Sequence, residues 1–275
     1  MIVADVQALL DARYPPQDAE PWDRVGLLSG EASRPVTHIA CALDPDLETI
    51  RRASQCGADL LVTHHPTWLA REPDEAPSMY GLTLEYAARE SGIALIACHT
   101  NLDVSEEARL SLGNGLNLKS EGTLADWFEG EETPFEQPDF AQLWSTKRKT
   151  TLEHIADRLS RLYRTPVRLT IRCGGPDHLI FSIVTATGSG GDVIEAACAR
   201  HADLLITGEL KYHQLLEARD LGLSVIELGH DVSEWPLAAL LFDALKPACE
   251  ASDVRITLLK RVLQSDVRDR RKNRP

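Results

Sequence analysis

The sequence predicts an α/β protein made of two similar halves, each with a mostly parallel sheet flanked by helices. Two observations predict this fold class. Helix and strand signals alternate along the chain, and the segment ADLLVT at residues 58–63 recurs as ADLLIT at residues 202–207. Alternating strands and helices are typical of a largely parallel sheet that is covered by helices. The recurrence indicates that this arrangement occurs twice.

In the first half, helical periodicity begins at Val3, and the apolar, β-branched segment 36–43 predicts a buried strand. Asp44 suits an N-cap and Pro45 suits the first helical position, so we expect the next helix to run to Gly57. A strand, a helix and a further strand complete this half, at residues 58–63, 79–91 and 93–98.

An acidic, proline-bearing and aperiodic stretch at residues 113–150 predicts a linker or an irregular crossover. The alternation then resumes, with a helix at 151–163, strands at 167–172, 179–186, 203–207 and 223–228, a helix from Ser233 and a last strand at 254–259. We therefore divide the chain into a first α/β half (1–112), the linker or crossover (113–150), a second α/β half (151–259) and a basic tail (260–275). The two halves could also form one compact unit.

A second match supports internal duplication. GIALIACHTNLD (92–103) aligns with GLSVIELGHDVSE (222–234) with a one-residue gap, and both end in a histidine followed four positions later by an acid. These pairs are His99 with Asp103 and His230 with Glu234. A six-residue match alone is weak, but two matches in the same order indicate a duplicated half-domain. Ligands of parallel α/β sheets gather at the carboxyl ends of the strands, where these pairs fall.

The composition narrows the class of protein. A net charge of −13 and a pI near 5.1 disfavour nucleic acid as a main partner. The basic tail, with seven Lys/Arg against two Asp, is better explained as a solvated terminus than as a nucleic-acid tether. No apolar run reaches the ~18 residues that a membrane helix needs, and no signal peptide is evident, so we expect a soluble, cytoplasmic protein. Six cysteines without a CxxC pair predict reduced thiols and argue against a thiolate zinc site.

Histidines at strand ends carry the candidate chemistry. Four of the nine histidines, His64, His65, His99 and His230, follow three predicted strands. Imidazole and carboxylate ligands suit Zn, Fe or Mn. Adjacent His64 and His65 point to opposite sides of an extended backbone, which favours two metal ions ~3.5–4 Å apart over a single ion. Glu234 or Asp103 could bridge such a pair. A Ser-His-Asp triad fits worse, because no G-x-S-x-G elbow is present.

The GSGG motif at residues 188–191 has two interpretations. It could hold an anion at a helix N-terminus, but it lacks the P-loop Lys-Ser/Thr and the GxGxxG spacing. A tight strand-to-helix turn is favoured.

Five motifs together resemble those of the Nif-three-like dinuclear metal-centre proteins, whose members are often labelled GTP cyclohydrolase type 2 homologues. They are PWDRVGLLSG (21–30), VTHHP (62–66), CHTNLD (98–103), ITGELKYH (206–213) and GHDVSEW (229–235). The resemblance implies two similar α/β domains with a two-metal site between them, and a ring-shaped homohexamer acting on a small-molecule substrate. Arg24 departs from the Asn common in the family, and residues 113–150 are too short for the inserted domain of longer members.

Carried over by position, the resemblance implies the metal ligands His64, His65, Asp103, His230 and Glu234, with Glu234 as the bridge. His99 would bind a metal or orient a ligand. The leading hypothesis is a metal-dependent hydrolase that uses a metal-activated water, with Glu234, His99 and His213 as catalytic candidates and Glu209 as a further proton-transfer group. A solvated helix position explains His213 equally well. The alternative is a non-catalytic metal-binding or regulatory adaptor.

Overall fold

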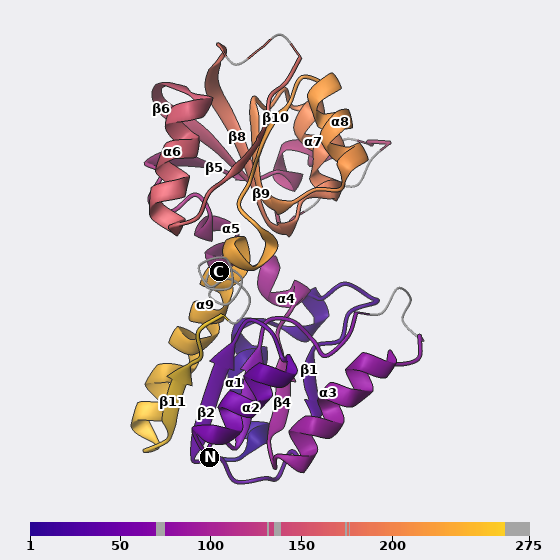
Figure 1. The fold of residues 1–275 in the computed structure, drawn as a ribbon, viewed down its shortest axis with the longest axis vertical. Helices are drawn as coiled ribbons and strands as arrows, with labels where there is room; N and C mark the ends of the chain where they lie inside the picture. Colours follow the sequence, from indigo (N-terminus) through magenta and orange to yellow (C-terminus); the bar gives the residue numbers. More distant parts are fainter. Residues whose placement is uncertain (70–74, 131, 135–138, 174, 176, 262–275) are drawn as a thin grey trace, which may run out of the picture. The chain divides into compact units, whose positions relative to one another are not determined.

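The computed structural model describes residues 1–69, 75–130, 132–134, 139–173, 175 and 177–261. The chain forms two compact units: residues 103–234 form one, and the described residues on either side of that range form the other. Each unit is a mixed β-sheet flanked by helices (Figure 1). No helix in this described part of the chain combines the length and apolarity needed to cross a bilayer.

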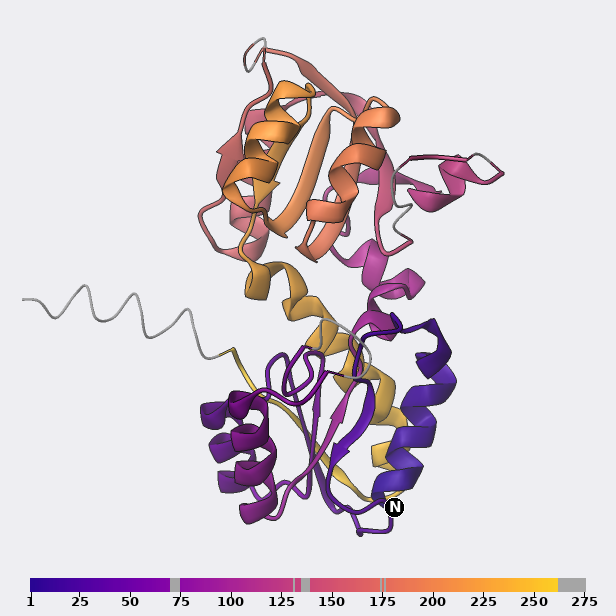
Figure 2. The ribbon, with the colours of Figure 1, turned by 90° about the vertical axis from the view of Figure 1, so that its right-hand side faces the viewer.

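The first unit has a five-stranded sheet in the order β1-β4-β3-β2-β11. Its strands are β1 (Gly26–Ser29), β2 (His38–Ala42), β3 (Leu60–Thr63), β4 (Ala94–Ala97) and β11 (Arg255–Leu258). All are parallel to their neighbours except β1, which is antiparallel to β4. Figure 2 shows α1 (Val3–Arg13) on one face of this sheet, and α2 (Leu47–Gln55) and α3 (Met79–Glu90) on the other. The short helix α4 (Thr100–Asp103) follows β4.

The second unit has a six-stranded sheet in the order β5-β6-β8-β9-β10-β7. Its strands are β5 (Leu118–Thr123), β6 (Gln142–Thr151), β7 (Arg168–Thr170), β8 (Leu179–Ser189), β9 (Leu204–Glu209) and β10 (Ser224–Glu227). Strands β8, β9 and β10 are parallel, whereas β5, β6 and β7 pair antiparallel with their neighbours. The expectation of a mostly parallel sheet therefore holds for the first unit, where three of four strand pairings are parallel. It is wrong for the second unit, where three of five pairings are antiparallel. Its helices are α5 (Glu106–Ser111), α6 (Leu152–Tyr163), α7 (Ile194–Ala199) and α8 (Tyr212–Asp220).

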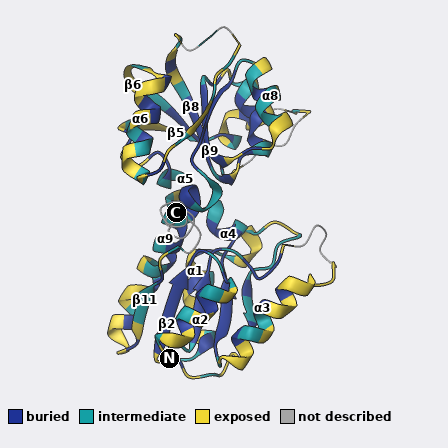
Figure 3. Cartoon of the chain, viewed as in Figure 1, coloured by how far each residue is buried: buried dark blue, intermediate teal, exposed yellow. Residues whose placement is uncertain are grey.

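The central strands of the second sheet are buried on both faces (Figure 3). Val184, Leu205 and Val225 belong to one apolar cluster. Their neighbours along the chain, Ile183, Leu204 and Ile226, belong to the cluster on the other face. Because successive side chains of a strand point to opposite faces, this alternation requires helices on both sides of the sheet.

The expectation of a linker or irregular crossover at 113–150 is wrong for much of that stretch, because it supplies the strands β5 and β6. Ala141, which precedes β6, and the first β6 residues, Gln142 to Trp144, are buried, so this segment is part of the second core. β5 is an edge strand with polar, partly exposed residues, which explains why its sequence lacks a strand signal.

Three further expectations need correction. Asp46, not Asp44, caps α2, since its side chain accepts a hydrogen bond from the backbone N of Thr49 at 2.8 Å. The long helix α9 (His230–Ala251) begins three residues before the expected Ser233. The sequence predicts the last strand, β11, in the second half, yet it pairs with β2 in the first sheet. The 22 residues of α9 carry the chain from one unit to the other before β11 begins.

The two units repeat the same order of elements and the same hydrogen bonds. Helix, antiparallel edge strand and three parallel strands occur as α1, β1, β2, β3 and β4, and again as α6, β7, β8, β9 and β10. Asp59 accepts hydrogen bonds from the backbone N of Thr37 and His38 at 2.8 and 3.2 Å. Asp203, 144 positions later, accepts from the backbone N of Phe181 and Ser182 at 2.8 and 3.1 Å. The match of ADLLVT with ADLLIT therefore extends to the hydrogen bonds that join neighbouring strands.

Candidate metal centre

Three histidines of the first unit lie together at the carboxyl ends of two parallel strands. His64 and His65 follow β3, and His99 follows β4. The ring centroids are 4.8 Å apart for His64 and His65, 5.1 Å for His64 and His99, and 5.6 Å for His65 and His99. Each ring offers a nitrogen, and the three nitrogens lie within 4.8 Å of one another. Three imidazole nitrogens this close to one another could hold a metal ion.

Each of these imidazoles is held through Nδ1 by an oxygen. His64 Nδ1 donates to the backbone O of Cys98 at 2.9 Å. His65 Nδ1 donates to Asp44 Oδ1 at 2.7 Å, and His99 Nδ1 donates to Asp23 Oδ1 at 2.9 Å. A neutral imidazole that donates through Nδ1 has its lone pair on Nε2, the arrangement in which protein histidines commonly bind metals. The residues present therefore fit a metal ion.

The carboxylate that holds His99 is itself fixed. Asp23 has a fully buried side chain, and Asp23 Oδ2 accepts from the backbone N of Thr100 at 3.0 Å and from Thr100 Oγ1 at 2.5 Å. Burial raises the pKa of Asp23, but the hydrogen bonds from His99 and Thr100 outweigh it and lower the pKa to about 2. The group is thus ionised at neutral pH and keeps the proton of His99 on Nδ1.

Arg24, which departs from the family pattern, packs the loop that carries Asp23. Its guanidinium lies 4.7 Å from the centroid of the Trp68 ring, and Nη1 lies 3.3 Å from Glu85 Oε1. Glu85 Oε1 also accepts a hydrogen bond from Thr67 Oγ1 at 2.9 Å. Arg24 therefore connects the loop after α1, which carries Asp23, to the segment that follows His65. These contacts join the partner of His99 to the loop of His65.

In the second unit, His230 and Glu234 form a pair on the first turns of α9. His230 Nε2 lies 2.9 Å from Glu234 Oε2, and His230 Nδ1 lies 3.0 Å from Glu209 Oε1. The Glu234 side chain is 6% exposed, whereas that of Glu209 is 59% exposed. The i, i+4 spacing places the imidazole and the buried carboxylate on one helix face, as the sequence predicts. These two groups are also a fitting pair of metal ligands.

Two glycines allow other segments to pack closely against the start of α9. A Cβ on Gly188 would lie 2.1 Å from Glu234 Oε1, and a Cβ on Gly208 would lie 2.6 Å from Ser233 Oγ. Ser233 Oγ accepts from the backbone N of Gly188 at 2.9 Å and donates to the backbone O of His230 at 2.8 Å. The first glycine of GSGG and the glycine of ITGE thus allow the backbone to approach the His230–Glu234 turn closely.

The remaining predicted residues lie as follows. Asp103 ends α4, and His213 is exposed on α8. In the described part of the chain, neither is in a group of three or more ligand atoms within 4.8 Å of one another. Their roles stay predictions.

Sequence reasoning missed Asp44 as a partner of His65. A signal was present, since Asp44 follows β2, the parallel neighbour of β3, and its side chain therefore emerges at the same sheet edge as His65.

The fold and the histidine cluster define a two-unit α/β protein with a candidate metal centre. The chain belongs to the Duf34/NIF3 (NGG1p interacting factor 3) family, whose model matches residues 1–263. This confirms the resemblance inferred from the five motifs.

Relatives share most of their length with this chain. It is 29% identical to a GTP cyclohydrolase 1 type 2 homolog of Streptomyces coelicolor, covering 86% of this chain and 83% of the relative. It is 29% identical to another protein of that name from Clostridium perfringens, covering 94% and 97% of the two chains. Among solved structures, Staphylococcus aureus protein SA1388 aligns with a TM-score of 0.76 at 25% identity, over 96% of this chain and 98% of that one. A Bacillus cereus protein related to NIF3 aligns over the same shares with a TM-score of 0.79, and at 18% identity this likeness concerns the fold alone.

Proposed function

We propose that this protein holds two divalent metal ions through His64, His65, Asp103, His230 and Glu234, and that it is a metal-dependent hydrolase. The observation that carries the proposal is the set of three strand-end imidazoles whose Nδ1 atoms are all held by oxygens. All three rings are oriented in the same way, by an oxygen at Nδ1, and their ligand nitrogens lie within 4.8 Å of one another. This arrangement is typical of metal-binding histidines rather than of isolated core histidines. Membership of the family adds to the support.

We further propose that the two units arose by duplication and contribute to one centre. In support, the same order of elements and the same Asp59 and Asp203 hydrogen bonds occur in both units. A His-x-x-x-acid turn also follows the third parallel strand of each sheet, β4 or β10. Diverged copies would then supply different ligands, with paired imidazoles from one and a buried carboxylate from the other.

Divalent ions bound there would supply a water nucleophile near neutral pH and polarise a substrate. The curated relatives are named GTP cyclohydrolase 1 type 2 homologs, so we propose hydrolytic ring opening of a purine nucleotide as the first reaction to test, with phosphoester or amide hydrolysis beside it. The chain's own contribution would be positioning and proton transfer. Glu234 would bridge the ions, His99 would be held in one tautomer by ionised Asp23, and exposed His213 would face the substrate.

Metal content in matched variants tests the proposal. Protein purified without added metal should contain about two ions per chain by mass spectrometry of the metal. His65→Ala should lose metal, whereas His213→Ala should retain it and lose only turnover. Less than about one ion per chain, with none regained on soaking, would contradict the dinuclear centre. Two ions without turnover of nucleotides, phosphodiesters or cyclic amides would instead identify a metal-binding or regulatory adaptor.

We also propose that the protein is a homo-oligomer, with a hexamer as the expected form. Light scattering tests this directly. A mass close to the 30.4 kDa of a single chain would contradict it.

A further inference from the structure

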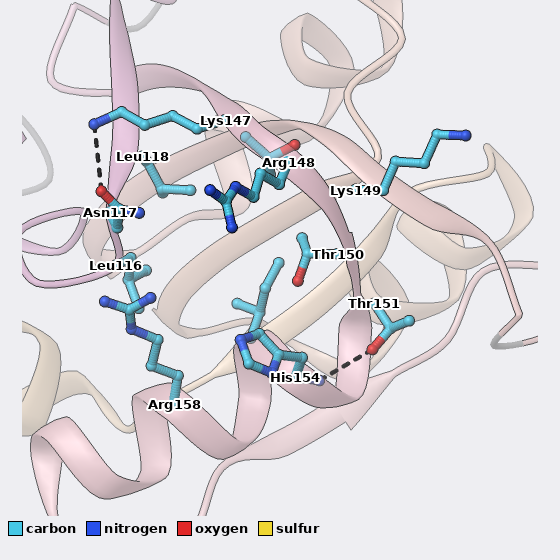
Figure 4. Close-up of a pocket in the computed structure, with 12 residues that line it drawn as sticks. Leu116, Asn117, Leu118, Lys147, Arg148, Lys149, Thr150, Thr151, His154 and Arg158 are labelled. Carbon is cyan, nitrogen blue, oxygen red and sulfur yellow. Dashed lines mark hydrogen bonds between the residues drawn. The ribbon is translucent and has the colours of Figure 1, made fainter.

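A basic pocket in the second unit is separate in its residues from the candidate metal centre. It lies between the start of β5, the second half of β6 and the first turns of α6 (Figure 4). Its volume is about 440 Å³, within the range of small-molecule sites. Of its twelve lining residues, four are Lys or Arg, one is His, and none is Asp or Glu. This concentration of positive charge contrasts with the net charge of −13 of the whole chain.

A local distortion of the sheet makes the pocket. Strand β6 pairs with β8 as far as Ser145 opposite Ser182, and pairing resumes at Thr150 opposite Ile180. β6 thus advances five positions where β8 advances two, and Lys147, Arg148 and Lys149 lie in the unpaired part. Bulges of this kind re-aim side chains and are frequent beside functional sites.

The cations of the pocket do not all point the same way. In Figure 4, Arg148, Arg158 and His154 face the hollow, whereas Lys147 and Lys149 extend away from it. Lys147 Nζ donates to Asn117 Oδ1 at 3.3 Å, and Arg158 Nη2 donates to the backbone O of Gly115 at 2.5 Å. Within the described residues, no ion pair joins Arg148 or Arg158 to a carboxylate. Their charge is available to a ligand rather than neutralised within the protein.

Two further features suit an anion with an organic body. The pocket borders the N-terminus of α6, a twelve-residue helix whose N-cap Thr151 accepts from the backbone N of His154 at 3.3 Å. The helix dipole adds positive potential there. Leu116 and Ile155 are buried and give the pocket an apolar wall. Guanidinium groups match phosphate oxygens in a bidentate manner, and an apolar wall can pack against a ring.

We propose that this pocket binds a phosphorylated small molecule of the size of a nucleoside monophosphate, with the phosphate on Arg148, Arg158 and His154 and the organic body against Leu116 and Ile155. This inference goes beyond the proposed metal centre and needs none of its ligands. A nucleic-acid strand is a poorer occupant, because backbone binding needs an extended basic stripe and this chain is acidic outside the hollow.

Calorimetric titration of the full chain with AMP, adenosine, inorganic phosphate and a single-stranded oligothymidylate tests the proposal. AMP should bind more tightly than either adenosine or phosphate. Arg148→Gln and Arg158→Gln should each weaken AMP binding at least about tenfold, the effect expected for loss of charge-assisted hydrogen bonds. Arg161→Gln is the matched control, since Arg161 is an exposed residue of the same helix outside the pocket. It should change AMP affinity by less than about twofold.

The same titration in His65→Ala separates this site from the metal centre, and AMP binding should be retained there. AMP binding could instead be lost in His65→Ala and unchanged in the Arg148→Gln/Arg158→Gln double variant. That result would place the nucleotide at the metal centre and contradict binding in the pocket. Absence of AMP binding at millimolar concentration would overturn it as well. If phosphate binds as tightly as AMP, the claim that the ligand has an organic body is wrong. If the oligothymidylate binds more tightly than AMP, the claim that the ligand is a small molecule is wrong.

Discussion

Asp44 Oδ1 accepts a hydrogen bond from His65 Nδ1 at 2.7 Å, which links the second residue after β2 to the second residue after β3. The aspartate two positions later, Asp46, has a different task and caps α2. Asp44 thus orients a histidine of the candidate centre, whereas Asp46 stabilises a helix terminus. They offer a matched pair of variants.

Asp44→Ala should weaken metal binding about 10–100-fold, because His65 would lose the partner that orients its ring and keeps its lone pair on Nε2. Competition with a chromogenic chelator measures the affinity. Asp46→Ala should leave metal affinity unchanged and lower the free energy of unfolding by about 0.5–2 kcal/mol through loss of the N-cap. Equal metal affinity in the two variants would refute the role of Asp44.

Gly188→Ala should disturb the His230–Glu234 pair, because the new Cβ would lie 2.1 Å from Glu234 Oε1. Gly188 also has a φ of 60°, which disfavours any residue with a Cβ. Gly222→Ala is the control, since its φ is 90° and no heavy atom lies within 4 Å of the added Cβ. Both variants should lose about 1–2 kcal/mol of stability from the backbone, and only Gly188→Ala should also lose metal. Urea denaturation and metal analysis distinguish the two effects, and full metal content in Gly188→Ala would count against Glu234 as a ligand.

Asp59→Asn should destabilise the protein by about 1–3 kcal/mol at neutral pH, because Asp59 Oδ2 accepts from Thr37 N, Thr37 Oγ1 and His38 N. Burial raises the pKa of Asp59, but these hydrogen bonds outweigh it, and the pKa is lowered from 3.8. A carboxylate with a lowered pKa contributes stability above its unfolded-state pKa, and this contribution is lost as pH falls through the folded-state pKa. The stability difference between wild type and variant should therefore narrow below about pH 4. Chemical denaturation at a series of pH values checks this, and a difference that stays constant to pH 2 would contradict it.

Arg24→Lys should lower the free energy of unfolding by about 0.5–2 kcal/mol, since a lysine cannot both stack on Trp68 and reach Glu85 as a planar guanidinium does. Arg51→Lys is a suitable control, because Arg51 pairs with Glu48 on an exposed helix face and its replacement should change stability little. Thermal unfolding of both variants measures the difference. An unchanged midpoint for Arg24→Lys would show that the contact with Trp68 contributes nothing.

Local patterns account for what was predictable in the fold. Apolar, β-branched runs predicted the strands β2, β3 and β4, and periodicity predicted α1, α3 and α6 within one or two residues of their observed ends. β5 was missed because an edge strand needs no apolar face of its own and its sequence, LKSEGT, is polar. The cap of α2 was misplaced because both Asp44 and Asp46 satisfy the sequence rule, and only the backbone geometry selects between them.

By itself, the sequence determined that this is an α/β protein of the Duf34/NIF3 family with histidines at its strand ends, because these properties depend on short-range periodicity and on motifs of a few residues. The tertiary structure decided which oxygens hold those histidines. His99 is held by Asp23, 76 positions away, and His65 by Asp44, 21 positions away. It also decided that β11 pairs with β2 and that 113–150 supplies strands to the second sheet. Such pairings are set by packing between segments distant in the chain, which no local window of residues encodes.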